Sequence, residues 1–280
     1  MQIRNLDAPL GAEVLGVDFS KPVSAETFAP IRQAFVDRGV LLVRDQQLTP
    51  EQLIALGRNF GPDEPYSSTL GEFLMPGHPE IIVLSNIVEN GKAAGVNGGG
   101  QYWHTDRSYV RQPAWSSVLY SREIPHDEHG APLGDTEFAS TIAAYDALPP
   151  DLKAFVDSHW AWHQYVFRFS ATNDSMPGVK HPIALPHPVS GRKCLYVNRG
   201  FTHHIMDVSA AENEAMLERL YAFQAEPRFV YRHKWRVGDV LMWDNYSTIH
   251  NAIPNYGPEH RRLMWRTTIK GFELEHMRAA

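Results

Sequence analysis

Cysteine is almost absent from this chain, since Cys194 is the single one among 280 residues. No disulfide can form within the chain, and no thiolate-rich zinc or iron–sulfur site can be built from it. A metal site would therefore have to use histidine and carboxylate side chains. The chain is well supplied with both, because it contains 14 histidines and 32 aspartate and glutamate residues.

A surplus of positive charge and a long apolar run are also missing. The 26 lysine and arginine residues leave a net charge of −6, whereas a general nucleic-acid binder needs clustered cations to neutralise phosphates. Residues 1–5 (MQIRN) lack the apolar stretch of a signal peptide, and no run approaches membrane-spanning length. We therefore expect a cytoplasmic enzyme or binding protein without nucleic-acid or membrane partners.

The apolar pattern predicts strands with helices inserted between them. One helix is expected from the capping residue Ser24 to Gly39, and a second begins at Thr49 with proline at its first position. Strands are expected at 40–43, 80–84, 116–121, 195–197 and 240–243. No proline- or serine-rich linker and no repeat divides the chain, so we predict one mainly β domain with helical insertions over residues 1–280.

The run Trp103-His104-Thr105-Asp106 carries the first candidate metal ligands. If these residues lie on a strand, the i, i+2 spacing places His104 and Asp106 on one face. His250, far downstream, offers a second imidazole. Two histidines and one carboxylate form a facial triad, which leaves coordination positions open and suits non-haem Fe(II) oxygenases. A His-x-Asp pair alone is a weak signal in a histidine-rich chain, so the prediction depends on its surroundings.

Two arginines close to the C-terminus provide further candidates. If residues 261–269 form a strand, Arg262 and Arg266 share one face and stand about 13 Å apart. Guanidinium groups on the inner face of a β-structure are costly unless they meet anions. The pair could hold a cosubstrate and a substrate around one metal ion, or could be surface arginines on an edge strand. The glycine-rich stretch 91–100 matches no phosphate-binding motif and is either a linker or part of the site.

Together these segments resemble the taurine dioxygenase family of Fe(II)- and 2-oxoglutarate-dependent dioxygenases, in order and over nearly the whole chain. The matching motifs are Trp103-His104-Thr105-Asp106, Gly134-Asp135-Thr136, His187-Pro188-Val189-Ser190-Gly191, Trp243-Asp244-Asn245 and Arg262-x-x-x-Arg266.

The resemblance implies a double-stranded β-helix, the jelly-roll architecture of cupins and their relatives. It also implies that His104, Asp106 and His250 bind Fe(II). Relatives that halogenate replace the carboxylate ligand, so the presence of Asp106 favours oxygenation. A homo-oligomer is expected, because relatives form dimers or tetramers.

The resemblance also assigns the residues that bind 2-oxoglutarate and the substrate. Thr136 and Arg262 match the residues that hold the distal carboxylate of 2-oxoglutarate, a geometry suited to a bidentate guanidinium. Arg266 matches the position that meets an anionic group of the substrate. The implied reaction consumes O2, releases succinate and CO2, and hydroxylates a C–H bond of the substrate.

Two departures from the family pattern concern the substrate. Glu64 lies among acidic residues where taurine dioxygenase has a sulfonate-binding histidine, and Arg107 replaces a small apolar residue directly after Asp106. We therefore expect a small organic acid or zwitterion other than taurine, with Arg266 or Arg107 facing an anion and Glu64 facing a cation. A solvated pair of loop residues is the alternative for Glu64 and Arg107.

Other functions remain open from the sequence. The same residues could catalyse desaturation or epoxidation, because the pose of the substrate alone distinguishes these reactions. A non-catalytic small-acid-binding protein would be expected to lose a ligand or the arginine, yet this chain keeps both. A zinc hydrolase would need a general base with zincin spacing, which is missing. His163 and His181 are candidates for substrate contacts.

Overall fold

A computed structural model describes residues 1–63, 68–165 and 177–274 of the chain. The predicted site residue Glu64 therefore lies outside the described residues. Among those described, no helix combines the length and apolar character needed to cross a membrane.

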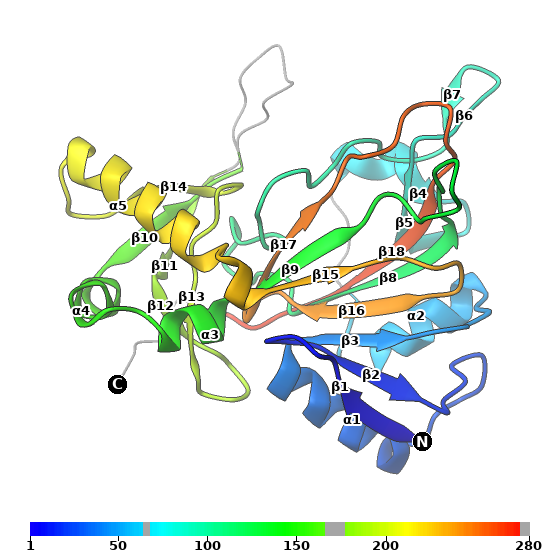
Figure 1. The fold of residues 1–280 in the computed structure, drawn as a ribbon, viewed down its shortest axis with the longest axis horizontal. Helices are drawn as coiled ribbons and strands as arrows, with labels where there is room; N and C mark the ends of the chain where they lie inside the picture. The colour runs from blue at the N-terminus through cyan, green and yellow to red at the C-terminus, as the bar shows by residue number, and fades with distance from the viewer. Residues whose placement is uncertain (64–67, 166–176, 275–280) are drawn as a thin grey trace.

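The largest element is an eight-stranded sheet in which the central strands come from distant parts of the chain (Figure 1). In spatial order it contains β1 (Gln2–Asn5), β2 (Ala12–Leu15), β3 (Val40–Val43), β16 (Val240–Asp244), β8 (Ser116–Glu123), β18 (Leu263–Ile269), β5 (His78–Ser85) and β4 (Leu74–Met75). The strands predicted at 40–43, 80–84, 116–121 and 240–243 are confirmed.

Two helices cover one face of this sheet, α1 (Ala25–Arg38) and α2 (Pro50–Arg58). Ser24 caps α1 by accepting a hydrogen bond from the Thr27 amide, and Gly39 ends it in the left-handed conformation at φ 70°. Thr49 and Gln52 form the predicted capping box of α2. Both helices therefore begin where the sequence predicts.

A second, three-stranded sheet faces the other side of the large one. It contains β15 (Val230–His233), β9 (Thr136–Ser140) and β17 (Thr248–Ala252). Side chains of β3 alternate between two cores, with Leu41 and Val43 packed toward the helices and Val40 and Leu42 toward the space between the sheets. Burial on both faces explains why this strand is an unbroken apolar run.

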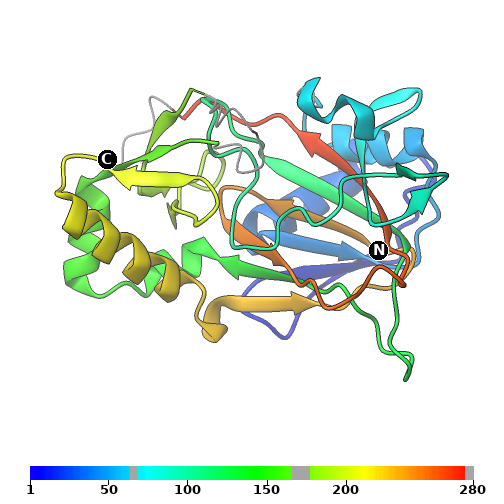
Figure 2. The ribbon, with the colours of Figure 1, turned by 90° about the horizontal axis from the view of Figure 1, so that it is seen from above.

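The remaining elements form a lobe beside the two sheets (Figures 1 and 2). They are α3 (Thr141–Asp146), α4 (Pro150–Ser158), β10 (Trp160–His163), β11 (Val179–Pro182), β12 (Ala184–Pro186), β13 (Lys193–Leu195), β14 (Thr202–Ile205) and α5 (Ala210–Gln224). The lobe has its own hydrophobic core, in which Leu152, Leu195 and Leu220 are buried. The strand predicted at 195–197 ends earlier than expected, at Leu195.

Shorter elements complete the chain. They are η1 (Ser68–Phe73), β6 (Val88–Glu89), β7 (Lys92–Ala93) and η2 (Pro227–Phe229). The glycine-rich stretch 91–100 begins in the turn between β6 and β7 and includes β7.

Candidate metal centre and active site

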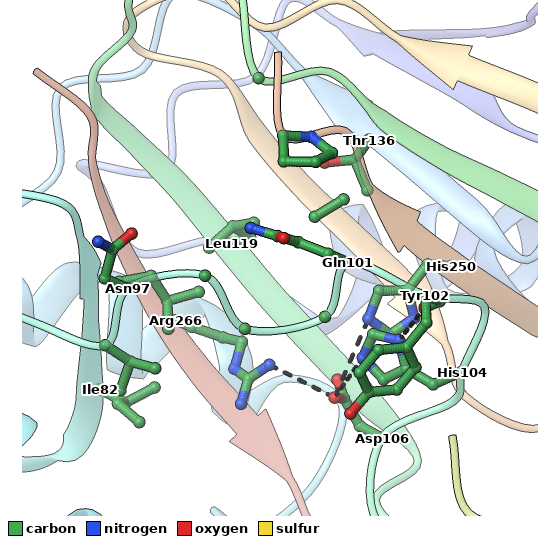
Figure 3. A pocket seen from close by; sticks show the side chains of 18 of the residues that line it. Ile82, Asn97, Gln101, Tyr102, His104, Asp106, Leu119, Thr136, His250 and Arg266 are labelled. Carbon is green, nitrogen blue, oxygen red and sulfur yellow. Dashed lines mark hydrogen bonds and ion pairs between the residues drawn. The ribbon is translucent and has the colours of Figure 1, made fainter. Parts of the chain in front are cut away.

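His104, Asp106 and His250 come together at the wall of one pocket (Figure 3). The Nε2 atoms of His104 and His250 lie 3.9 and 4.0 Å from Asp106 Oδ1. One possible ligand atom from each residue lies within 4.8 Å of the other two, and all three residues are buried. This donor set fits one divalent metal ion with open positions.

The backbone brings the two histidines together. The amide of His104 donates to the carbonyl of His250 at 3.0 Å, and the amide of His250 donates to the carbonyl of His104 at 2.7 Å. The prediction that His104 and Asp106 share a strand is wrong. His104 forms only this isolated bridge, and Asp106 lies in a turn in which Arg107 has a φ of 60°.

Each imidazole is oriented in a different way. His104 Nδ1 lies 2.8 Å from the carbonyl of Tyr102, so its N–H donates there and leaves the Nε2 lone pair for a metal. The ring of His250 is stacked on Phe138 and contacts Trp243 at a centroid distance of 4.8 Å. Burial lowers the pKa of both histidines, which keeps them neutral as metal binding requires.

The carboxylate of Asp106 faces a cation as well as the histidines. Arg266 Nη1 lies 3.4 Å from Asp106 Oδ1 (Figure 3). Burial alone would raise the pKa of Asp106, but the nearby Arg266, His250 and His104 outweigh it and hold this pKa well below its usual range. Asp106 is therefore ionised and available as a metal ligand.

A cavity of about 290 Å³ extends from this cluster between the two sheets. At one end Arg262 and Thr136 line it, and the Nε atom of Arg262 is buried without a hydrogen-bond partner among the described residues. Gly134 has φ 76°, and a Cβ there would lie 2.9 Å from Arg262 Nε, so glycine makes room for the guanidinium. Burial lowers the pKa of Arg262, while contact with Tyr256 opposes this shift.

The other end of the cavity combines cations, amides and aromatic rings. Arg107 and Arg266, the candidates for contact with an anion of the substrate, both line it. Within residues 261–269, Arg262, Met264 and Arg266 share the inner face, as the spacing predicts. The glycine-rich stretch contributes its residues from Val96 to Gly100, so it is part of the site.

Sequence reasoning missed an aromatic wall in this half of the cavity. Its rings belong to Tyr102, Tyr109, Tyr165 and Phe201. Centroid distances are 4.8 Å between Tyr109 and Phe201, 5.1 Å between Tyr109 and Tyr165, and 6.5 Å between Tyr102 and Phe201. Tyr165 and Phe201 come from segments far along the chain from Tyr102 and Tyr109, so no local pattern in the sequence signals the wall.

His163 and His181, which the sequence leaves open as candidates for substrate contacts, do not line the cavity. Both are fully buried and hold Ser108, two residues after Asp106. Ser108 Oγ lies 3.1 Å from His163 Nδ1 and accepts from Asn198 Nδ2 at 3.1 Å, while its carbonyl accepts from His181 Nε2 at 2.9 Å. Burial lowers the pKa of His181 to about 4 and that of His163 well below its usual value.

This network makes Ser108 the point where the lobe is attached to the turn that carries Asp106. Ser108→Ala would leave buried polar atoms of His163 and Asn198 without partners, so we expect a loss of about 2–4 kcal/mol in unfolding free energy. Urea denaturation measures the loss. Ser247→Ala is the matched control, because the buried Ser247 Oγ has no hydrogen-bond partner among the described residues. Equal stability of the two variants would contradict a role for the network.

Comparison with known proteins identifies the family. Residues 2–268 match the family described as "Taurine catabolism dioxygenase TauD, TfdA family". The chain is 32% identical to the alpha-ketoglutarate-dependent 2,4-dichlorophenoxyacetate dioxygenase of Cupriavidus pinatubonensis, over 92% of this chain and 93% of the relative.

Solved structures agree with the sequence comparison. A putative alpha-ketoglutarate-dependent taurine dioxygenase from Burkholderia xenovorans superposes with a TM-score of 0.82 at 32% identity, covering 97% of this chain and 90% of that one. AAD-2, in complex with Mn(II) and N-oxalylglycine, superposes with a TM-score of 0.79 at 29% identity and 98% coverage of both chains.

The solved structures confirm the predicted jelly-roll fold. The family and its relatives confirm the predicted oxidoreductase activity on a small molecule. The chain belongs to the TauD/TfdA family of dioxygenases, whose members use Fe(II), 2-oxoglutarate and O2.

Proposed function

We propose that His104, Asp106 and His250 bind the catalytic Fe(II) within a single domain formed by residues 1–280. The observation that carries the proposal is the convergence of two neutral imidazoles and one ionised carboxylate within 4.8 Å, at the wall of the main cavity. Bound Fe(II) would supply O2 activation, for decarboxylation of 2-oxoglutarate to succinate and CO2 and for oxygenation of the substrate. The protein would contribute the ligand geometry and a partly enclosed pocket.

Thr136 and Arg262 would hold the distal carboxylate of 2-oxoglutarate. The Trp235 Nε1–H donates to Thr136 Oγ1 at 3.0 Å. An indole nitrogen can only donate, so the Thr136 hydroxyl accepts there and keeps its own hydrogen for a ligand in the cavity. Arg262 would supply two parallel N–H donors, and a carboxylate would give its partly enclosed guanidinium the anion that it lacks among the described residues.

The substrate would be a small organic anion with an apolar, ring-bearing body. Arg266 and Arg107 supply positive charge at one end of the cavity, and the aromatic wall supplies apolar surface beside it. The relative from Cupriavidus pinatubonensis acts on 2,4-dichlorophenoxyacetate, which combines an aromatic ring with a carboxylate. Hydroxylation of a C–H bond is the proposed outcome, while desaturation or epoxidation would use the same residues.

The metal assignment is tested by anaerobic addition of Fe(II) and 2-oxoglutarate. We expect a visible metal-to-ligand charge-transfer band that is lost in Asp106→Ala, because the variant removes the charged ligand. Asp146→Ala is the control, since Asp146 is exposed and pairs only with Arg192 among the described residues. The absence of a band in the unmodified protein would refute the assignment.

The substrate class is tested by succinate release across a panel of acids. Phenoxyacetate and phenylacetate should support faster release than taurine, which has no apolar body to fill the aromatic wall. Comparable rates with taurine and the best acid would overturn this proposal without affecting the metal assignment. A homo-oligomer and a cytoplasmic location stay predictions, and light scattering after gel filtration measures the first.

A further inference from the structure

We propose that Ser117, oriented by Asn245, keeps Asp106 a one-oxygen ligand and thereby preserves an open coordination position for O2. The proposal rests on the assignment of Asp106 as an Fe(II) ligand and goes beyond it by naming what controls the number of oxygens that bind. It depends on a chain of directed hydrogen bonds that ends on the Asp106 carboxylate.

Asn245, in the turn between β16 and β17, has a fixed amide orientation. Its Oδ1 accepts from Trp243 Nε1 at 3.0 Å and from the backbone amide of Asp106 at 3.2 Å. Both of these partners are N–H groups that cannot accept, so the amide oxygen must face them. The Nδ2 group of Asn245 therefore points the other way and donates to Ser117 Oγ at 3.2 Å.

Ser117, on β8, connects Asn245 to the Asp106 carboxylate through hydrogen bonds of fixed direction. Because its Oγ accepts from Asn245, its single hydrogen is available for Asp106 Oδ2, and the two oxygens lie 2.6 Å apart. Ser117 and Asn245 are completely buried and Asp106 is 7% exposed, so water does not compete strongly for these groups.

The two oxygens of Asp106 therefore have different surroundings. Oδ2 is held by Ser117, while Oδ1 faces Arg266 and both histidine Nε2 atoms. In an octahedral site, two imidazoles and one carboxylate oxygen leave three positions, enough for a chelating keto acid and O2. If Oδ2 also coordinated the metal, it would occupy the third position. The Ser117 hydrogen bond opposes that arrangement.

The test counts the water molecules bound to Mn(II), used in place of Fe(II), by water-proton relaxation in the full-length protein. With saturating 2-oxoglutarate, the unmodified enzyme should keep an inner-sphere water contribution. Ser117→Ala should lose it, because the released Oδ2 takes the position of that water. Asn245→Asp should lose it as well, since a carboxylate at this position cannot donate to Ser117 and instead competes for its hydrogen.

Two further variants separate this role from general structural damage. Ser116→Ala is the matched control, because Ser116 is the preceding residue of β8, is equally buried, and has no side-chain partner among the described residues. Ser116→Ala should retain the inner-sphere water contribution. Ser117→Thr should retain it as well, because threonine keeps a hydroxyl donor at this position. Retention of the water in Ser117→Ala would overturn the role of Ser117, with or without weaker Mn(II) binding, and retention in Asn245→Asp alone would overturn the orienting role of Asn245.

Failure of the Ser117 proposal can be distinguished from failure of the metal assignment. If the unmodified protein shows no charge-transfer band with Fe(II) and 2-oxoglutarate, the metal site itself is wrong. If the band forms and Ser117→Ala keeps its inner-sphere water, the site stands and only the role of Ser117 fails.

Discussion

Gly100→Ala is expected to weaken metal binding by about 10- to 100-fold, the size of effect seen when the support of a metal ligand is disturbed. A Cβ at Gly100 would lie 2.9 Å from Cε1 and 3.4 Å from Nε2 of His104, and the residue has φ 76°. The backbone cannot easily move away, because the carbonyl of Gly100 accepts from the amide of Ala252 on β17 at 2.9 Å. His104 would have to shift instead. Calorimetric titration with Mn(II) measures the effect.

Two other glycines of the same stretch, Gly99 and Gly91, separate a steric cause of this loss from backbone strain. Gly99→Ala adds the same methyl group, but its nearest contact would be an ordinary 3.7 Å to Val96. Gly91→Ala imposes the same backbone strain at φ 77°, yet meets nothing within 4 Å. Both variants should bind Mn(II) normally, and Gly91→Ala should lose about 1–2 kcal/mol of stability from strain alone. Normal Mn(II) affinity in Gly100→Ala would show that the segment does not support His104.

Arg262→Leu is expected to raise the KM for 2-oxoglutarate by about 100-fold or more, since removing one partner of an enclosed charge pair costs about 2–5 kcal/mol. The KM of Arg262→Lys for 2-oxoglutarate should lie between those of Arg262→Leu and the unmodified enzyme, because an ammonium keeps the charge but not the two parallel donors. Steady-state rates at varied 2-oxoglutarate concentration measure both.

The adjacent arginine provides the control for this substitution. Arg261 is exposed and pairs with Glu123 at 2.9 Å on the molecular surface. Arg261→Leu therefore removes the same kind of side chain without touching the cavity, and its KM for 2-oxoglutarate should remain unchanged. Equal KM values for the Arg262 and Arg261 variants would exclude Arg262 as the anchor of the cosubstrate.

Local sequence signals predicted the helix ends and the inner face of the last strand. Ser24, Gly39 and Thr49 act within one turn of chain, so their effects can be seen without knowing the fold. The alternation that directs Arg262 and Arg266 to the same cavity is equally local.

Long-range geometry could not be predicted in this way. His104 pairs with a residue 146 positions away through a single backbone bridge, and the chain then turns at Arg107 rather than continuing as a strand. A period of two in the sequence cannot reveal such a turn. The role of His163 and His181 was open for a related reason, because their partner Ser108 belongs to a different segment.

The division of the molecule into two sheets and a lobe has an evolutionary consequence. Thr136, Arg262 and His250 belong to the sheet half, whereas Tyr165 and Phe201 reach the cavity from the lobe, which has a core of its own. Mutations at Tyr165 or Phe201 would therefore change which molecule is accepted and leave in place the residues proposed to bind iron and 2-oxoglutarate, as long as the lobe keeps its contacts to Ser108. Such a separation would allow the aromatic wall to change without altering the proposed iron ligands.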